Sequence, residues 1–158
     1  MADPAPYANF RFRIKWDGKY VAGISKVGGL IRTTDVVELQ QGAPATVAVP
    51  SPGRTRYEPI TLERGVTQDT AFEQWANQTF IYGAGAAPSP NYRKDIVLDL
   101  YNEADQLVLS YQLYGCWPSQ YCALPALDAS VEAVAIESLT LQIEGWTRDL
   151  TVVPPASP

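Results

Sequence analysis

The chain has 158 residues and a formal net charge of −5, with two cysteines and no histidine. This length suits one domain that can bury a core without disulfides, and no apolar run is long enough to span a membrane. The absence of histidine excludes Ser-His-Asp and Cys-His catalysis and His-ligated zinc. The mild acidity, without any basic stripe, argues against a conventional nucleic-acid binder.

Two further features bear on the compartment. The N-terminus lacks the basic start and apolar segment of a secretory signal, so we expect synthesis in the cytoplasm. Cys116 and Cys122 are spaced too widely for a CxxC redox or zinc pair. Free thiols are the expected state in that compartment, and a short-loop disulfide formed after release is the alternative.

The chain opens with a predicted β-hairpin. Residues 9–16 alternate strictly between apolar and cationic side chains, Asp17-Gly18 is a tight-turn signal, and a second strand is expected over 20–26. One face of the first strand carries only Arg11, Arg13 and Lys15. This row of cations is either a solvated face or one that meets an acidic neighbour, because like charges on one strand face repel each other.

A third strand is expected over 33–40, followed by the proline-rich stretch 42–53. A loop of this length inside a compact domain is usually either disordered or an interaction element. Val47 and Val49, which stand between the prolines, favour an arm that docks on a neighbour.

Residues 57–80 contain a strand followed by the clearest amphipathic helix of the chain. Thr67 is the expected N-cap, and Asp69 would lie in the first turn, opposite the positive end of the helix dipole. The apolar stripe of this helix contains Ala71, Phe72, Trp75, Ala76 and either Thr79 or Phe80.

The second half of the chain contains further strands. A hairpin is expected from the strand 94–101, a turn, and the strand 106–114, whereas 118–128 is irregular. In 130–146 the apolar phase shifts near Glu137. Because a one-residue slip turns every side chain to the other face, we expect a β-bulge or a sharp bend there.

Together these patterns predict one domain over residues 1–158, mainly β with one α-helix. The expected fold is an antiparallel β-sandwich or part-barrel with the helix packed on one face or edge. Residues 1–7 and 147–158 are expected to form a flexible N-terminus and a C-terminal tail.

No catalytic, cofactor-binding or metal site stands out. The candidate carboxylate pairs are expected on solvent faces or in turns, without an apolar background that would raise a pKa; they are Glu58 with Glu63, Asp99 with Glu103, and Glu132 with Glu137. No glycine-rich phosphate loop is complete. Trp16, Trp75 and Trp117 lie on apolar faces, which favours core packing over a ligand-stacking platform.

Several short stretches follow one another in a recognisable order along residues 8–146: Phe10-Arg-Phe-Arg-Ile, Ile24-Ser-Lys-Val-Gly-Gly-Leu30, Glu38-Leu-Gln-Gln-Gly42, Ser51-Pro-Gly-Arg-Thr, Ile60-Thr-Leu-Glu-Arg-Gly-Val-Thr67 leading to Trp75, Asp95-Ile-Val-Leu-Asp, Trp117-Pro-Ser-Gln-Tyr121, and Val134-Ala-Ile-Glu-Ser-Leu-Thr-Leu141 with Glu144-Gly145. With these stretches the chain resembles the T4-like tail tube proteins of contractile phages. It is equally similar to the inner-tube proteins of phage-tail-like particles and extracellular contractile injection systems. The chain departs from the family pattern at Trp117, where a small residue is common, and in the tail after Trp146.

The resemblance implies a structural, non-enzymatic subunit without a cofactor. Such subunits form hexameric rings whose strands join in a barrel around a lumen, and the rings stack into a hollow tube. Implied partners are other copies of the chain, a sheath protein, and baseplate, tube-initiator and terminator proteins. DNA or protein cargo would pass through the lumen without specific binding, and the assembled tube could penetrate a membrane. Assembly is expected in the bacterial cytoplasm, as part of a virion tail or a released tail-like particle.

The resemblance also suggests contact residues. Candidates for contacts between subunits or rings are Val47, Val49, Pro50, Arg54, Arg11 and Arg13. On the helix, which would face outward, candidates for contact with the sheath are Asp69, Glu73, Gln74 and Asn77.

Three other functions remain open on the sequence. A tube-initiator or baseplate-proximal paralogue would cap the tube rather than repeat along it, and the length of the chain favours the repeating subunit. A soluble carbohydrate- or ligand-binding β-sandwich would use exposed aromatic side chains. A carboxylate-dependent hydrolase is the weakest of the three hypotheses.

Overall fold

The computed structural model describes residues 10–39, 49–80, 83 and 90–153, and the structural statements below refer to these residues. They form strands and a single helix in this order: β1 (Arg11–Trp16), β2 (Lys19–Tyr20), β3 (Ile24–Val27), β4 (Arg32–Leu39), β5 (Val49–Tyr57), β6 (Ile60–Gly65), α1 (Ala71–Thr79), β7 (Lys94–Tyr101), β8 (Leu107–Cys122), β9 (Ile136–Gln142) and β10 (Gly145–Arg148).

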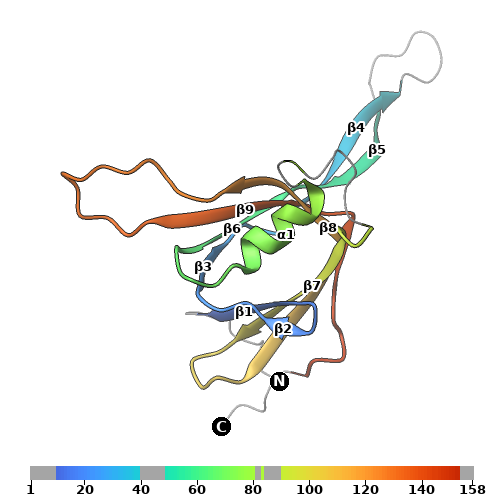
Figure 1. Ribbon diagram of the computed structural model, residues 1–158. Coiled ribbons are helices and arrows are strands. Elements are labelled where there is room, and N and C mark those ends of the chain that lie inside the picture. The colour runs from blue at the N-terminus through green and yellow to red at the C-terminus, as the bar shows by residue number, and fades with distance from the viewer. Residues whose placement is uncertain (1–9, 40–48, 81–82, 84–89, 154–158) are drawn as a thin grey trace.

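An 8-stranded antiparallel sheet makes up the body, in the order β2-β1-β7-β8-β9-β6-β3 with β10 beside β8. The long strand β8 bends, so that Leu107–Cys116 pairs with β7 and Trp117–Cys122 pairs with β9. The sheet therefore folds into two facing layers that share β8, and α1 lies across the space between them (Figure 1). The hairpin β4–β5 is a separate 2-stranded sheet that projects from the body. This architecture confirms the predicted β-sandwich or part-barrel with one helix.

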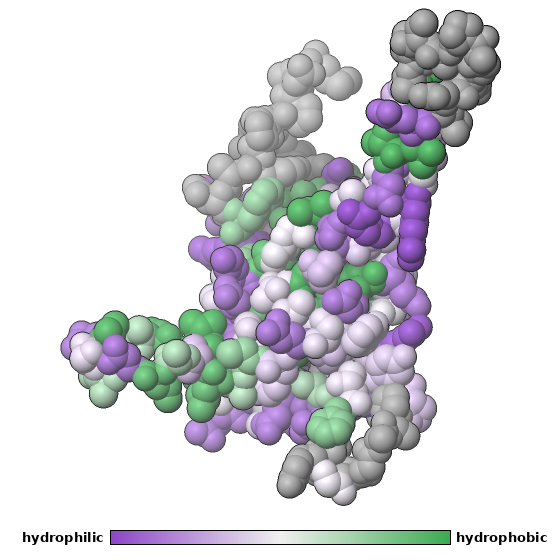
Figure 2. All heavy atoms as spheres, turned by 90° about the horizontal axis from the view of Figure 1, so that it is seen from above, coloured by the Kyte–Doolittle hydropathy of each residue, from purple (hydrophilic) through white to green (hydrophobic). Residues whose placement is uncertain are grey.

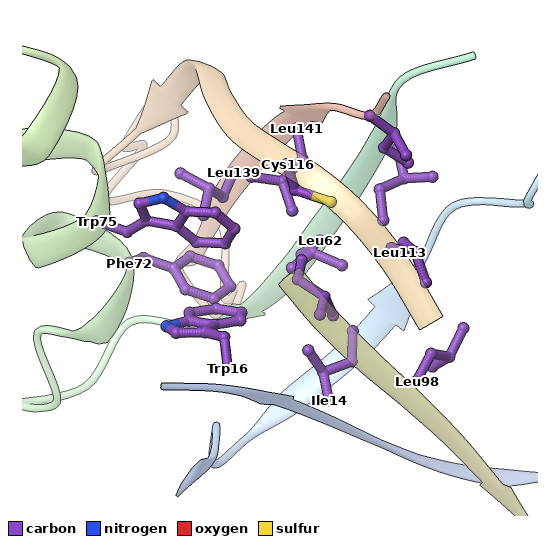
Figure 3. Packing of buried hydrophobic residues seen from close by; sticks show 13 residues of the cluster. Ile14, Trp16, Leu62, Phe72, Trp75, Leu98, Leu113, Cys116, Leu139 and Leu141 are labelled. Carbon is purple, nitrogen blue, oxygen red and sulfur yellow. The ribbon is translucent and has the colours of Figure 1, made fainter. Parts of the chain in front are cut away.

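Aromatic side chains from α1 and β1 close the core. Trp16 lies with its ring centroid 4.8 Å from that of Trp75 and 6.1 Å from that of Phe72. The indole of Trp75 donates a hydrogen bond to the carbonyl of Tyr92 at 2.8 Å, which satisfies its buried N–H. Around these rings pack buried aliphatic residues of both layers (Figure 3), among them Ile14, Ile60, Leu62, Ile96, Leu98, Leu113, Leu139 and Leu141.

A buried ion pair connects the turn before α1 to strands β6 and β9. Arg64 on β6 is 1% exposed and Glu137 on β9 is 6% exposed, and the guanidinium Nε donates to the Glu137 carboxylate. Arg64 Nη2 also donates to the carbonyl of Asp69 at 2.7 Å, and the guanidinium carbon lies 4.4 Å from the ring centroid of Phe72. Tyr121 on β8 donates to the other carboxylate oxygen at 3.3 Å. The Arg64 guanidinium, through Glu137 and Tyr121, thus connects strands β6, β9 and β8 to the turn before α1.

The helix begins later than predicted. Its first residue is Ala71 after Thr70, so the expected N-cap at Thr67 is wrong. The Thr67 hydroxyl instead accepts a hydrogen bond from the Asp69 N–H at 3.1 Å, and the Asp69 carboxylate accepts one from the Ala71 N–H at 2.9 Å. Two consecutive side-chain turns therefore precede the helix, because both side chains bind backbone groups two residues onward. Asp69 lies ahead of α1, and the acidic residue of its first turn is Glu73.

The expected strand 20–26 is divided between two partners. Tyr20 ends the pairing with β1, whereas β3 pairs with β6. Gly23, with φ at +78°, lies between the two segments and allows the chain to change direction.

The β-bulge or sharp bend expected near Glu137 is also wrong, because Ile136–Gln142 is one continuous strand. β9 pairs with β6 without a register shift, and Glu137 shares the inward face with Leu139 and Leu141. The apparent phase change arises because Val134 belongs to the preceding loop and is exposed. The carboxylates Asp99 and Glu137 are buried, contrary to the expectation of solvent faces or turns for the carboxylate pairs.

Three segments expected to be irregular contain strand. Of the proline-rich stretch 42–53, residues 49–53 belong to β5, and the remainder, including Val47, falls outside the described residues. Pro50 and Pro52 fit there because a strand of a 2-stranded hairpin has one free edge, where a missing N–H costs no ladder bond. Residues 118–122 complete β8, and 147–148 end β10. The N-terminal 1–7 also lies outside the described residues.

Cys116 and Cys122 are both free, as expected, but their environments differ. Burial raises the pKa of the Cys116 thiol to about 12, whereas Cys122 is only partly buried. Because the thiolate is the reactive form, a thiol reagent at pH 8 should label one thiol per folded chain rapidly and the second only in denaturant. Cys122→Ser should abolish the rapid phase. Equal labelling rates for both thiols would contradict this assignment.

Replacing Arg64 with methionine should lower the free energy of unfolding by about 3 to 5 kcal/mol, because the Glu137 carboxylate would remain buried without its partner. Urea unfolding followed by tryptophan fluorescence measures the change. The double variant Arg64→Met with Glu137→Leu should recover much of the loss. If the single variant were as stable as the parent, the prediction would be wrong, because leaving Glu137 without Arg64 would then not lower the free energy of unfolding.

Candidate assembly surfaces

Among the described strands, the layer formed by β8, β9, β6 and β3 has a free edge on each side. From Trp117 to Cys122, β8 pairs with β9 on one side, while β7 has already left its other side at Lys94. At the opposite end of the layer, β3 pairs with β6 alone among the described strands. Both edges therefore present backbone donors and acceptors that another strand can pair with.

The directions of these four strands determine how two copies can join. All neighbours in the layer are antiparallel, so β8 and β6 run one way and β9 and β3 run the other way. If two copies stand side by side in the same orientation, β3 of one meets β8 of the next in the antiparallel sense. The layer can thus continue from copy to copy with antiparallel pairing throughout.

The outer face of this layer carries hydroxyl and amide groups. The Thr61 and Thr140 hydroxyls lie 3.1 Å apart across β6 and β9, and Gln142 donates to the Ser119 hydroxyl at 3.0 Å. Among the described charged residues here, Lys26 and Glu63 approach to 3.7 Å and offset each other. Trp117, opposite Gln142, and Ile136, opposite Gly65, share this face, so it is largely polar with some apolar surface and little net charge.

Two segments project from opposite ends of the same layer (Figure 1). The β4–β5 arm, comprising Arg32–Leu39 and Val49–Tyr57, extends from one end. The 123–135 loop, which joins β8 to β9, extends from the other. Both expose apolar side chains, and Figure 2 shows them gathered along the loop; they are Val36, Val37 and Val49 on the arm, and Leu124, Leu127, Val131 and Val134 on the loop.

The charges of the two segments are opposite in part. On the arm, Arg56 is paired with Asp35 at 2.6 Å and with Glu58 at 3.2 Å, and Arg54 adds a further cation. On the loop, Asp128 accepts hydrogen bonds from the hydroxyl and the N–H of Ser130, and these bonds lower the pKa of its carboxyl. Asp128 is therefore firmly ionised at neutral pH.

The predicted contact residues are spread over different surfaces. Val49, Pro50 and Arg54 lie on β5 in the arm. Arg11 and Arg13 lie on β1 of the 8-stranded sheet, whereas that hairpin is a separate 2-stranded sheet.

The row of cations on β1 has partners within the chain. Arg11 forms an ion pair with Asp105 at 2.7 Å, and Arg13 lies 5.3 Å from the Tyr101 ring centroid. Lys15 lies 5.5 Å from the Tyr20 ring centroid. Intramolecular contacts thus compensate much of the repulsion along this strand face.

The helix candidates divide between two locations. Glu73, Gln74 and Asn77 are exposed on α1, and Gln74 donates to the Thr70 hydroxyl at 2.8 Å. Asp69 precedes the helix and contacts Arg64. The polar face of α1 is therefore available to a partner on the side away from the core.

Within the described ranges, no group of three or more His, Cys, Asp or Glu residues could hold a metal ion. No helix of the described chain is long and apolar enough to cross a membrane.

Sequence reasoning missed the 123–135 loop as an interaction candidate. Its signal was present in Leu124, Leu127, Val131 and Val134, four large apolar residues in a stretch that forms neither strand nor helix. Apolar residues in an irregular segment are unusual unless something covers them.

Solved structures with the same fold come from contractile and secretion assemblies. A chain of the anti-feeding prophage tube-terminating cap gives a TM-score of 0.76 at 24% identity, covering 94% of each chain. A chain of the PVC sheath/tube terminator, from an extracellular contractile injection system in its extended state, gives 0.75 at 23% identity, covering 94% of this chain and 99% of that one. An Hcp protein gives 0.58 at 11% identity, covering 94% of this chain and 96% of that one. At these identities the likeness establishes the fold.

Sequence comparison identifies the family. No curated protein is similar enough in sequence to count as a match. The family model for T4-like virus tail tube protein gp19, however, matches residues 8–147, which is most of the chain and nearly the stretch over which the resemblance was recognised. The chain therefore belongs to the T4-like tail tube protein family and is a structural subunit of a tail tube.

Proposed function

We propose that six copies of this chain close into a ring and that the rings stack into a hollow tube through which DNA or protein cargo passes. The observation that carries this proposal is the four-stranded layer with a free, antiparallel-compatible edge on each side. Six such layers give a barrel of about 24 strands, which exceeds the 16 to 18 strands that already leave an aqueous channel. Closing the ring pairs both edges and removes an aggregation liability.

The outer face of the β8–β9–β6–β3 layer lines the channel in this proposal. Its opposite face is covered by the core and α1, so only the hydroxyl- and amide-bearing face is free to meet cargo. Thr61, Thr140 and Gln142 offer neutral hydrogen-bonding groups, and the nearby Lys26 is offset by Glu63. A surface of low net charge does not hold a polyanion, so acidic cargo can slide along it.

Stacking joins the β4–β5 arm of one ring to the 123–135 loop of the next. The two segments project from opposite ends of the layer, and a head-to-tail contact of this kind repeats without closing. Apolar side chains on both segments lose water on contact, and Arg54 on the arm faces an acidic loop that contains Asp128 and Glu132. This assigns the inter-ring role to the arm predicted from its prolines and valines.

The polar face of α1, with Glu73, Gln74 and Asn77, points outward and contacts the sheath in this proposal. The similar chains in sheath–tube and terminator assemblies support partners of the same kind. Baseplate and terminator proteins would cover the two ends of the tube. Subunits would assemble in the bacterial cytoplasm, act without enzymatic activity, and enter a membrane only as part of the finished tube.

A tube-initiator that caps rather than repeats is the second candidate, because a baseplate chain has the same fold, with a TM-score of 0.72 at 20% identity. The two functions differ in what the purified chain builds. A repeating subunit forms tubes of many rings, whereas an initiator stops at one ring.

Negative-stain microscopy of the concentrated protein should show rings with a central hole and stacked tubes, because both the edges and the protruding segments find partners only in other copies. Light scattering over a dilution series measures the same assembly in solution. A strictly monomeric protein at every concentration and salt condition would overturn the proposal. Tryptophan fluorescence that responds to glycans in such a monomer would favour the ligand-binding sandwich.

Replacing Val36 with aspartate should shorten the tubes while leaving single rings intact. The substitution removes roughly 1.5 kcal/mol of apolar burial at each arm–loop contact and places a carboxylate beside the acidic loop. Because each junction between two rings contains several arm–loop contacts, the loss of binding free energy at each contact adds up over the junction. Tube length in micrographs is the readout, and Leu150→Asp, at an exposed apolar residue outside the arm and loop, is the matched control. Tubes of parental length in the Val36 variant would contradict the stacking assignment.

A further inference from the structure

An apolar groove opens beside the free edge of β3. Its volume is about 450 Å³, and it lies between the start of β1 and the end of β3, on the core side of both layers. The lining side chains include Phe12, Val27, Leu30, Leu98, Leu100 and Tyr111. Leu98 belongs to the buried core, and the other five are partly buried residues that pack against it. None of the residues that line the groove is charged.

An exposed phenylalanine lies beside the other free edge. Phe80 follows the last residue of α1 in an extended conformation and is 64% exposed. It lines a hollow of about 270 Å³ together with Pro118 and Tyr121, which lie on the part of β8 that pairs with β9 on one edge only. Because α1 packs on the core side of the layer, Phe80 lies on that same side.

The groove and Phe80 stand at the same level along the strands. Through the register pairs, Val27 is level with Leu62, Leu139 and then Tyr121 across the layer. Gly28 is hydrogen-bonded to Thr61, one residue further toward the arm. If β3 of one copy pairs with β8 of the next in the register that keeps these levels aligned, the groove of the first faces Phe80 of the second.

We propose that Phe80 of each copy inserts into the groove beside β3 of the neighbouring copy in the ring. This inference rests on the proposed ring closure and adds a side-chain contact to the strand pairing. Backbone pairing alone is insensitive to sequence, whereas an aromatic anchor in an apolar groove fixes which edges meet and in what register. Burial of the phenyl ring also removes a large apolar side chain from water.

Cysteine cross-linking tests the contact. In a Cys122→Ser background, Phe80→Cys combined with Leu30→Cys should give a ladder of covalent oligomers on a denaturing gel after mild oxidation of assembled protein. Phe80→Cys combined with Leu150→Cys is the matched control and should stay largely monomeric on that gel. Rings in the microscope without a ladder would overturn the groove contact and leave the ring intact. Parental protein without rings would overturn the proposed function itself.

A second measurement separates the contact from folding. Phe80→Asp should raise the protein concentration at half-assembly by about tenfold or more, whereas Phe80→Leu should change it little. The thermal midpoint of the dilute monomer should stay the same, because the side chain is largely exposed in the single chain. Unchanged assembly of Phe80→Asp, or a destabilised monomer, would each contradict the proposal.

Discussion

The architecture depends on the continuity of β8. This strand is 16 residues long, and no single partner pairs with all of it. Gly115 divides it: its φ is +60°, in the left-handed region that favours glycine. Before this point β8 belongs to one layer and after it to the other. The change of layer leaves the edge of Trp117–Cys122 without β7, and that edge is the main reason to expect assembly.

The buried pair of Arg64 and Glu137 supports the same layer from within. Burying the two charges costs desolvation free energy, and further contacts offset this cost. The guanidinium donates to the Asp69 carbonyl and stacks on Phe72, and Tyr121 donates a hydrogen bond to the Glu137 carboxylate. The pair therefore fixes the entry of α1 against strands β6, β8 and β9. If this helix shifted, Phe80 and the free edge of β8 would no longer keep their relative position.

Local pattern was enough to predict much of the fold but not its polar interior. The strand Lys94–Tyr101 and the turn at Asp17-Gly18 were recognised because alternation and turn chemistry act over a few residues. The burial of Glu137 was not recognised, because its partner Arg64 is 73 positions away and neither residue signals the other. The predicted helix start was wrong for a local reason. Thr67 and Asp69 each form a side-chain turn with the backbone two residues onward, so the capping residue recognised first in the sequence does not begin the helix. The partners of Arg11 and Arg13 within the chain, Asp105 and the Tyr101 ring, were likewise not indicated by the local pattern.

A single copy leaves exposed what a ring or a tube would cover. The free edges lie to the sides of the layer and the projecting segments lie at its ends, so the two kinds of contact act in perpendicular directions. Each contact joins different surfaces of the two copies, which permits closure in one direction and unlimited repetition in the other. Apolar exposure such as the 78% of Val134 or the 64% of Phe80 invites aggregation when partners are unspecific. The charges of the arm and the loop, together with the shape of the groove, restrict those partners to one geometry. This specificity favours ordered assembly into a tube over non-specific aggregation.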